Sequence, residues 1–460
     1  MNKIFKVLAG NTIVFALGNG ATLIISFFMI PVYTSILSTK DFGISDIIVT
    51  TIAMLSPVFS LNIFTAVFRW ALDNNNSENE IYTNGLLVSF VGSILSLFLG
   101  CFLWIAGIKY SWAVGINLAA VLMLNHFQNF TRGINKIKLY SFSGLVGTFV
   151  NVISNILLMI ILPWGIKGYL ISLILGNVSI SIFLIIFGRL NKYWDKSKIS
   201  KEKIKAMLIY SMPMIPNSFT WWMTNDASRV IIMIVIGPAG NGLYAVANKI
   251  PSLITTLFGL FQNAWQISAV DISKEKEVEK VYTVVFNIVL ALLFFGAAVI
   301  VSIIKYFMRF YVANSYYEAW KFIPILLLTA VFSNVSAFLG TTYLVKKKTK
   351  GLFSTTIWGM IINVILSILF IPLFGLYGAS LSGAIGFLFV STLRLKQTSE
   401  WITIKIEWKL QVLLISGYLV ISSIEYLTNE LFIIKIIILS SMFLFILFYI
   451  KRTSLNTFNR

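Results

Sequence analysis

The chain consists of long apolar runs separated by short polar connections, and these runs constrain its fold more than any other feature. Each run holds roughly 20 residues or more, the length at which a helix crosses the hydrocarbon core of a bilayer. Backbone amides in hydrocarbon must be hydrogen-bonded within their own segment, and the runs lack the alternation of a membrane barrel. With 58% hydrophobic and 12% charged residues, the sequence predicts an all-α integral membrane protein.

Hydropathy windows of about 19 residues place the individual spans and predict about fourteen transmembrane helices. We expect them at 11–37, 43–68, 83–107, 112–131, 141–163, 168–188, 207–236, 243–270, 282–304, 320–342, 352–371, 376–393, 410–427 and 431–450. An even number of spans puts both termini on one side of the membrane. Most of the 36 lysines and arginines lie in connections on that side, so the positive-inside rule predicts a multi-pass protein with both termini in the cytoplasm.

The composition excludes several classes of function. The net charge of +19 comes from basic residues dispersed among the connections, so we expect contact with membrane lipids and none with nucleic acid. Cys101 is the only cysteine, which leaves no disulfide or thiolate metal site. The spans contain no cluster of metal ligands, no nucleophile with its base and no phosphate-binding loop, so neither an enzyme nor a bound metal or cofactor is expected.

An internal repeat divides the chain. The pattern G-x-x-G-x-x-x-S-x-x-x-G occurs at Gly165–Gly176 and again at Gly375–Gly386. Four further residues recur in the same order, since Lys136, Lys138, Gly147 and Asn151 match Lys348, Lys350, Gly359 and Asn363. Because six spans separate equivalent positions, the two copies have the same orientation in the membrane. The repeat predicts two pseudo-symmetric six-helix lobes around a central cavity, followed by a C-terminal helix pair.

The longest polar stretch marks the boundary between the two copies. We expect an N-terminal lobe at 1–190, a basic cytoplasmic linker at 191–205, a C-terminal lobe at 206–396, and the last two spans with a cytoplasmic tail at 397–460. The charge of the linker is typical of a topology signal that also meets anionic headgroups.

Charge inside a span is costly and usually faces a bundle interior or a watery cavity, and the best candidates of this kind are Asp226, Arg229 and Lys249. Asp226 and Arg229 are three residues apart on one helix and therefore share a face, so they are expected to pair or to couple transport to an ion. Lys249 stands beside Asn248 and just before Pro251, and it is the strongest candidate for binding an anion. A structural ion pair and a lysine that extends to the interface are the competing interpretations.

Other polar residues within the spans carry weaker signals. Asp46 is a candidate cation or proton site, or else a residue that caps its helix or anchors a loop near the membrane edge. Arg69 and Arg132 are expected at the cytoplasmic side, in a gate or as anchors. His126, the only histidine, stands among aliphatic residues and is expected to be a hydrogen-bonded packing residue.

Amide and aromatic side chains gather in the first two spans of the second copy. Trp221, Asn225, Asn248 and Gln262 provide hydrogen-bonding groups and a ring face suited to sugars. Helix packing and interfacial anchoring are the alternative interpretations of the same residues.

The order of several short motifs resembles the polysaccharide flippases of the multidrug/oligosaccharidyl-lipid/polysaccharide (MOP) exporter superfamily. The resemblance rests on Pro31, Asp41-Phe42-Gly43, Arg132-Gly133 with Lys136 and Tyr140, Tyr210-Ser211-Met212-Pro213, Asp226 with Arg229, and Gly242-x-Tyr244-x-x-Ala247-x-Lys249. It covers the chain from about residue 5 to about residue 450.

The resemblance implies a flippase of the bacterial cytoplasmic membrane. Its substrate would be an undecaprenyl-pyrophosphate-linked oligosaccharide repeat unit of O-antigen, capsule or exopolysaccharide, moved to the outer leaflet by alternating access. Lys249 and Arg229 would bind the head group, with coupling to a proton or sodium gradient as a further expectation. A polymerase and other polysaccharide-assembly proteins are the partners that the resemblance implies.

Two relatives of the same fold remain as alternatives. A multidrug or cation antiporter usually carries an acidic residue in its first span, whereas residues 8–39 contain neither Asp nor Glu. A lipid II flippase tends to have basic residues in its first two spans, which this chain lacks at the matching positions. A membrane scaffold without transport would not require the buried charges of Asp226, Arg229 and Lys249.

Overall fold

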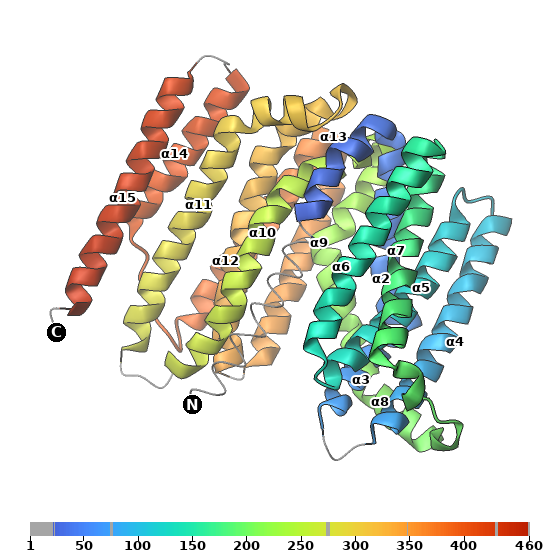
Figure 1. Ribbon diagram of the computed structural model, residues 1–460. Coiled ribbons are helices and arrows are strands. Elements are labelled where there is room, and N and C mark those ends of the chain that lie inside the picture. The colour runs from blue at the N-terminus through green and yellow to red at the C-terminus, as the bar shows by residue number, and fades with distance from the viewer. Residues whose placement is uncertain are drawn as a thin grey trace. The chain divides into compact units, whose positions relative to one another are not determined.

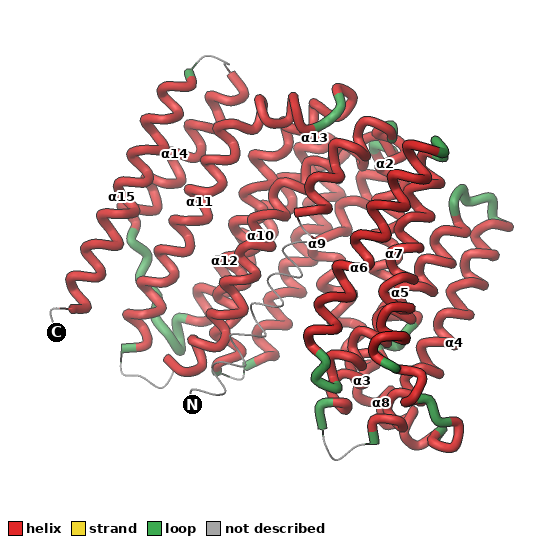
Figure 2. The backbone as a smooth tube through the Cα atoms, viewed as in Figure 1, coloured by secondary structure: helices red, strands yellow, loops and turns green. Residues whose placement is uncertain are grey.

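A computed structural model describes residues 22, 24–73, 77–272, 277–346, 348–427 and 431–458. Within these ranges the regular structure is helical throughout and no strand is present (Figure 2). Ten helical stretches of the described residues are long and apolar enough to cross a membrane, and a shorter apolar helix covers Ile24–Ile36. The fold class predicted from the apolar runs, an all-α integral membrane protein, is confirmed.

The chain forms two compact units, Met1–Trp222 and Met223–Arg460. The helices of the first unit, shown in blue to green in Figure 1, are α2 (Thr39–Phe59), α3 (Ile63–Ala71), α4 (Glu78–Ile105), α5 (Ser111–Gly133), α6 (Ile137–Asn155), α7 (Gly165–Gly188) and α8 (Lys201–Ser211). The boundary falls within α9 (Ile215–Val235). The second unit continues with α10 (Pro238–Ile272), α11 (Val278–Tyr311), α12 (Ile323–Val345), α13 (Thr349–Thr398), α14 (Trp408–Leu427) and α15 (Phe432–Phe458). The division of the two lobes at 191–205 stays a prediction.

Every predicted span from 83–107 onwards coincides with helical residues, whereas residues 11–21 and 23 of the predicted first span, 11–37, lie outside the described residues. The prediction of one continuous span at 43–68 is wrong, because the chain breaks between α2 and α3. Leu61 and Asn62 adopt left-handed backbone angles there, with φ of 49° and 55°. The Ser60 hydroxyl donates to the Ser56 carbonyl at 2.7 Å and accepts the N–H of Asn62 at 3.1 Å, and the Asn62 N–H also donates to the Pro57 carbonyl at 3.0 Å, so backbone and side-chain bonds together close the turn.

The predicted pair of spans at 352–371 and 376–393 is contained in α13. Gly375 interrupts this helix with φ 58° and ψ −134°, a conformation that favours glycine because a Cβ atom would strain it. Gly165, which matches Gly375 in the repeat, has φ 54° at the start of α7. The same backbone turn therefore occurs in both copies.

Equivalent glycines of the repeat make equivalent contacts, which confirms that the sequence repeat is a structural one. A Cβ atom on Gly176 would lie 3.1 Å from the Cβ of Asn151, and one on Gly386 would lie 3.2 Å from the Cβ of Asn363. The next pair behaves in the same way, because Gly147 packs against Ile180 and Gly359 against Val390. Small residues at these positions let neighbouring helices approach closely in lipid.

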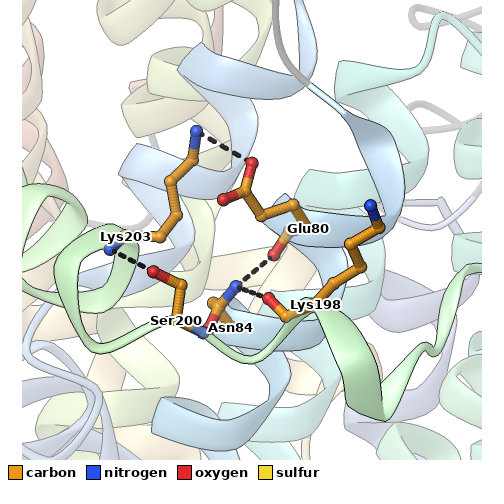
Figure 3. Close-up of polar contacts among 5 residues, drawn as sticks. All are labelled: Glu80, Asn84, Lys198, Ser200 and Lys203. Atoms are coloured by element: carbon orange, nitrogen blue, oxygen red, sulfur yellow. Dashed lines mark hydrogen bonds and ion pairs between the residues drawn. The ribbon is translucent and has the colours of Figure 1, made fainter.

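Within the first unit, the connection after α7 is held by one buried asparagine of α4, as Figure 3 shows. The Asn84 amide donates to the Lys198 carbonyl at 2.9 Å and accepts the N–H of Ser200 at 2.9 Å. Lys203 forms an ion pair with Glu80 at 3.2 Å. In the second unit Asn287 of α11 binds the connection after α13 by the same kind of paired bonds, to Lys405 and Glu407.

We expect Asn84→Ala to loosen this connection and to lower the free energy of unfolding by about 1–3 kcal/mol, because buried backbone groups would lose their partners. Thermal unfolding in detergent should show a lower midpoint, and trypsin should cut the lysine-rich connection faster. Asn191→Ala is the matched control, because Asn191 is exposed in the same connection. Equal proteolysis of both variants would contradict the prediction.

Candidate functional site

A polar cavity of about 210 Å³ lies inside the second unit, between α9, α10, α12 and α13. None of the residues that line it is charged, and most carry a hydroxyl or an amide group. The hydroxyl and amide groups of the lining include those of Asn225, Asn248, Thr255, Thr329, Ser333 and Asn363. A hydroxyl-rich and amide-rich hollow inside a bundle that is otherwise apolar is costly unless water or a ligand satisfies it.

Hydrogen bonds between helices fix the cavity wall. Asn363 of α13 donates its amide to the Thr224 carbonyl of α9 at 2.6 Å, and one turn further Ser367 meets Ser228 at 2.9 Å. Thr329 of α12 donates to the Ser380 carbonyl at 3.3 Å. Three helices are therefore joined around the cavity by side chains that also line it or stand next to it.

The first unit fills the matching place with a direct contact. By the offsets that relate Gly147 to Gly359 and Gly176 to Gly386, Asn117 corresponds to Thr329 and Asn177 to Phe387. The Asn177 amide donates to the side-chain amide oxygen of Asn117 at 2.8 Å, whereas Thr329 and Phe387 both line the open cavity. At this pair of positions the first copy thus has a direct hydrogen bond, and the second copy has part of the cavity wall.

The predicted pairing of Asp226 with Arg229 is confirmed. The Arg229 Nε lies 3.3 Å from Oδ1 of Asp226, with side chains that are 17% and 25% exposed respectively. Lys249 is exposed on α10 and does not line the cavity, although its neighbour Asn248 does. Successive residues of a helix point about 100° apart, so α10 presents its amide to the cavity and its ammonium group to another face.

The four predicted amide and aromatic residues separate in the structure. Asn225 and Asn248 line the cavity, while Trp221 is 65% exposed. Gln262 donates to the Ala337 carbonyl at 2.9 Å and to the Thr341 hydroxyl at 2.8 Å. Its amide therefore joins α10 to α12, which is the packing role left open by the sequence.

The remaining candidates lie in the first unit. Asp46 is half-buried two turns into α2, and the cap of that helix is Ser38, so a capping role for Asp46 is wrong. Arg69 is exposed in the last turn of α3. The Arg132 guanidinium lies 4.3 Å from the centroid of the Phe68 ring, which suits an anchor between α5 and α3.

His126 is a packing residue, as predicted, and it packs against Tyr82 with ring centroids 5.2 Å apart. The expectation of a hydrogen bond is wrong, because neither ring nitrogen has a hydrogen-bond partner among the described residues. Phe338 occupies the corresponding position of the second copy and packs against Tyr282, the counterpart of Tyr82. The imidazole thus takes the place of an aromatic ring.

A family model described as a polysaccharide biosynthesis protein matches residues 8–257, which is more than half of the chain. The chain belongs to this family. Another relative, an uncharacterized membrane protein of Methanocaldococcus jannaschii, is 24% identical over 370 residues, which cover 75% of this chain and 87% of the relative.

Solved structures with the same fold are transporters of the MOP superfamily. A structure described as the lipid II flippase MurJ in an inward closed conformation has a TM-score of 0.68 at 16% identity, covering 97% of this chain and 100% of that chain. An inward-facing multidrug resistance MATE family transporter has a TM-score of 0.69 at 12% identity, covering 82% and 93%. These likenesses show that this family member has the fold of those transporters, as the resemblance to MOP flippases predicts.

Two charged residues of this family member are buried in polar contacts. Lys435, which lies within the predicted span 431–450, forms an ion pair with Glu425, with side chains 2% and 1% exposed. Glu425 is the only acidic residue of α14. One acidic and one basic residue on neighbouring apolar spans were therefore the sequence signal for this ion pair.

Arg394, which directly follows the predicted span 376–393, is also buried, at 7% exposure. Its Nε donates to the Thr355 hydroxyl at 3.0 Å, one terminal nitrogen to the carbonyl and hydroxyl of Ser336, and the other to the Thr356 hydroxyl. Neutral oxygens thus satisfy a cation that joins α12 to both halves of α13.

Proposed function

We propose that this protein moves an undecaprenyl-pyrophosphate-linked oligosaccharide from the cytoplasmic to the outer leaflet of a bacterial cytoplasmic membrane. The observation that carries the proposal is the uncharged cavity of the second unit, lined by hydroxyl and amide groups. Such groups hydrogen-bond sugar hydroxyls and offer no counter-charge to an organic cation. Membership of a polysaccharide-biosynthesis family supports the same substrate class.

The uncharged and the cationic residues would bind different parts of the substrate. Asn225, Asn248 and the hydroxyls of the cavity would hold sugar rings, while Lys249 and Arg229 would attract the pyrophosphate. The membrane potential favours outward movement of an anion from an inside-negative cell by about 2.3 kcal/mol per charge per 100 mV. The cationic side chains of Lys249 and Arg229 would then need only reduce the free-energy cost of removing the pyrophosphate head group from water.

A flipping assay in sealed proteoliposomes tests this proposal. We expect Arg229→Gln combined with Lys249→Gln to lower the rate for a fluorescent lipid-linked oligosaccharide at least tenfold, because two charge-assisted contacts of about 1.5–3 kcal/mol each would be lost. Lys280→Gln is the control, since Lys280 makes only an exposed ion pair with Glu277. Full activity of the double variant would disprove the role of the two cations.

The same vesicles separate the sugar contacts from the charge contacts. Thr255→Val removes a cavity hydroxyl at nearly constant volume and should slow the oligosaccharide carrier more than undecaprenyl pyrophosphate without sugar. Thr392→Val is the matched control, because Thr392 is exposed on α13 and bonds only its own helix. Collapsing the proton and sodium gradients in turn tests ion coupling, and transport of organic cations or lipid II in place of the oligosaccharide would favour the alternatives.

A further inference from the structure

The short helix α8 is fixed to the first unit on one side and leaves its other side open. Met207 is buried in the core formed with α3, and the Ser211 hydroxyl donates to the Leu61 carbonyl at 2.8 Å. Lys203 pairs with Glu80 at 3.2 Å and lies 5.0 Å from the Trp70 ring centroid. These contacts hold α8 against α3 and α4, so its open side is a fixed surface.

An apolar groove of about 600 Å³ runs beside this open side. All its lining residues are apolar, and they come from the end of α2, from the stretch Leu87–Leu95 of α4, and from Ile204 and Leu208 of α8. Gly92 lets the walls meet, because a Cβ atom there would lie 2.2 Å from the Phe59 carbonyl oxygen. The groove therefore follows α4 for about two turns, which suits an extended acyl chain.

Two lysines of α8 lie beside the groove. A second hollow, of about 480 Å³, is lined by Lys201 and Lys205 and shares Ile204 and Leu208 with the groove. Both lysines are exposed, and neither has an ion pair within the described part of the chain. They are four residues apart on one helix face, where like charges repel each other unless an anion lies between them.

We propose that this surface binds one anionic phospholipid, with an acyl chain in the apolar groove and the phosphate between Lys201 and Lys205. The apolar lining accommodates only hydrocarbon, and the two ammonium groups favour a headgroup with net negative charge over a zwitterionic one. The basic connection that precedes α8 would draw such lipids to the same place. The inference does not depend on what the protein transports.

Native mass spectrometry of the full chain tests the inference, with phosphatidylglycerol and phosphatidylcholine as probes. The wild-type protein should retain one phosphatidylglycerol molecule. The double variant Lys201→Gln with Lys205→Gln should weaken this binding roughly 30-fold, because each lysine contributes about 1 kcal/mol to the attraction of an anionic lipid. Lys196→Gln with Lys198→Gln is the matched control, because both residues are exposed in the same connection but outside the groove. Val91→Trp, which fills the groove without altering charge, should also release the lipid.

Each other outcome would overturn the inference. Equal weakening by both double lysine variants would mean diffuse attraction to the surface, and equal retention of phosphatidylcholine would mean an apolar annular lipid only. Tighter binding of undecaprenyl phosphate in competition would assign the groove to a substrate. Thermal unfolding of each variant shows whether it has folded, and retention of phosphatidylglycerol by a folded Val91→Trp variant would exclude the groove.

Discussion

Replacing Lys435 with Met should lower the free energy of unfolding by about 3–5 kcal/mol, the cost of leaving one buried charge without its partner. The Glu425 carboxylate would lose the ammonium group that pairs with it, in a place where both side chains are almost fully buried. The neighbouring Lys305 does not replace it, because its ammonium group donates to the Glu425 backbone carbonyl at 3.3 Å and lies 4.8 Å from the Trp320 ring centroid. Chemical denaturation in mixed micelles measures the loss.

The double variant Glu425→Gln with Lys435→Met distinguishes a broken pair from a damaged core. Removing both charges abolishes the desolvation cost that the single variant leaves, so the double variant should recover most of the stability. Lys280→Met provides the comparison at an exposed pair with Glu277, where we expect a change below about 1 kcal/mol. A double variant as unstable as Lys435→Met would mean that packing, and not charge, holds α15 to its unit.

The second large effect is expected at Gly378, where Ala should destabilise the protein by about 3 kcal/mol, the upper end of overpacking costs. A Cβ atom there would lie 2.1 Å from the carbonyl oxygen of Phe370. This neighbour is backbone, so the two halves of α13 would have to separate around the bend at Gly375. The midpoint of thermal unfolding should fall, and so should the transport rate if the bend shapes the cavity.

Alanine substitutions at two further glycines provide comparisons for Gly378→Ala. Gly168, the counterpart of Gly378 in the first unit, would place its Cβ 2.8 Å from the Leu158 carbonyl oxygen, so Gly168→Ala should have a smaller effect of the same sign. Gly296 of α11 has no atom within 4 Å of an added Cβ, and Gly296→Ala should stabilise its helix by about 1 kcal/mol. The prediction fails if Gly378→Ala is as stable as Gly296→Ala.

Much of the fold follows from local properties of the sequence. The length and apolar character of each run decide that it forms a helix, because a backbone in lipid has no other way to satisfy its amides. The repeat is readable as well, since Gly147, Gly176 and their counterparts Gly359 and Gly386 occur in the same order at nearly the same spacing in both copies. The break at Ser60–Asn62 is not, because the left-handed backbone of Leu61 and Asn62 interrupts the helix without changing its hydropathy.

The sequence by itself therefore determined a duplicated, all-helical membrane protein and the pairing of Asp226 with Arg229, which lie one turn apart on one helix. Only the tertiary structure decided which polar groups face a cavity. Asn248 lines it and Gln262 does not, although both are amides of α10, because the contacts of a side chain depend on the helix packed opposite. The setting of Lys435 was decided in the same way, since its buried partner, Glu425, lies on another helix.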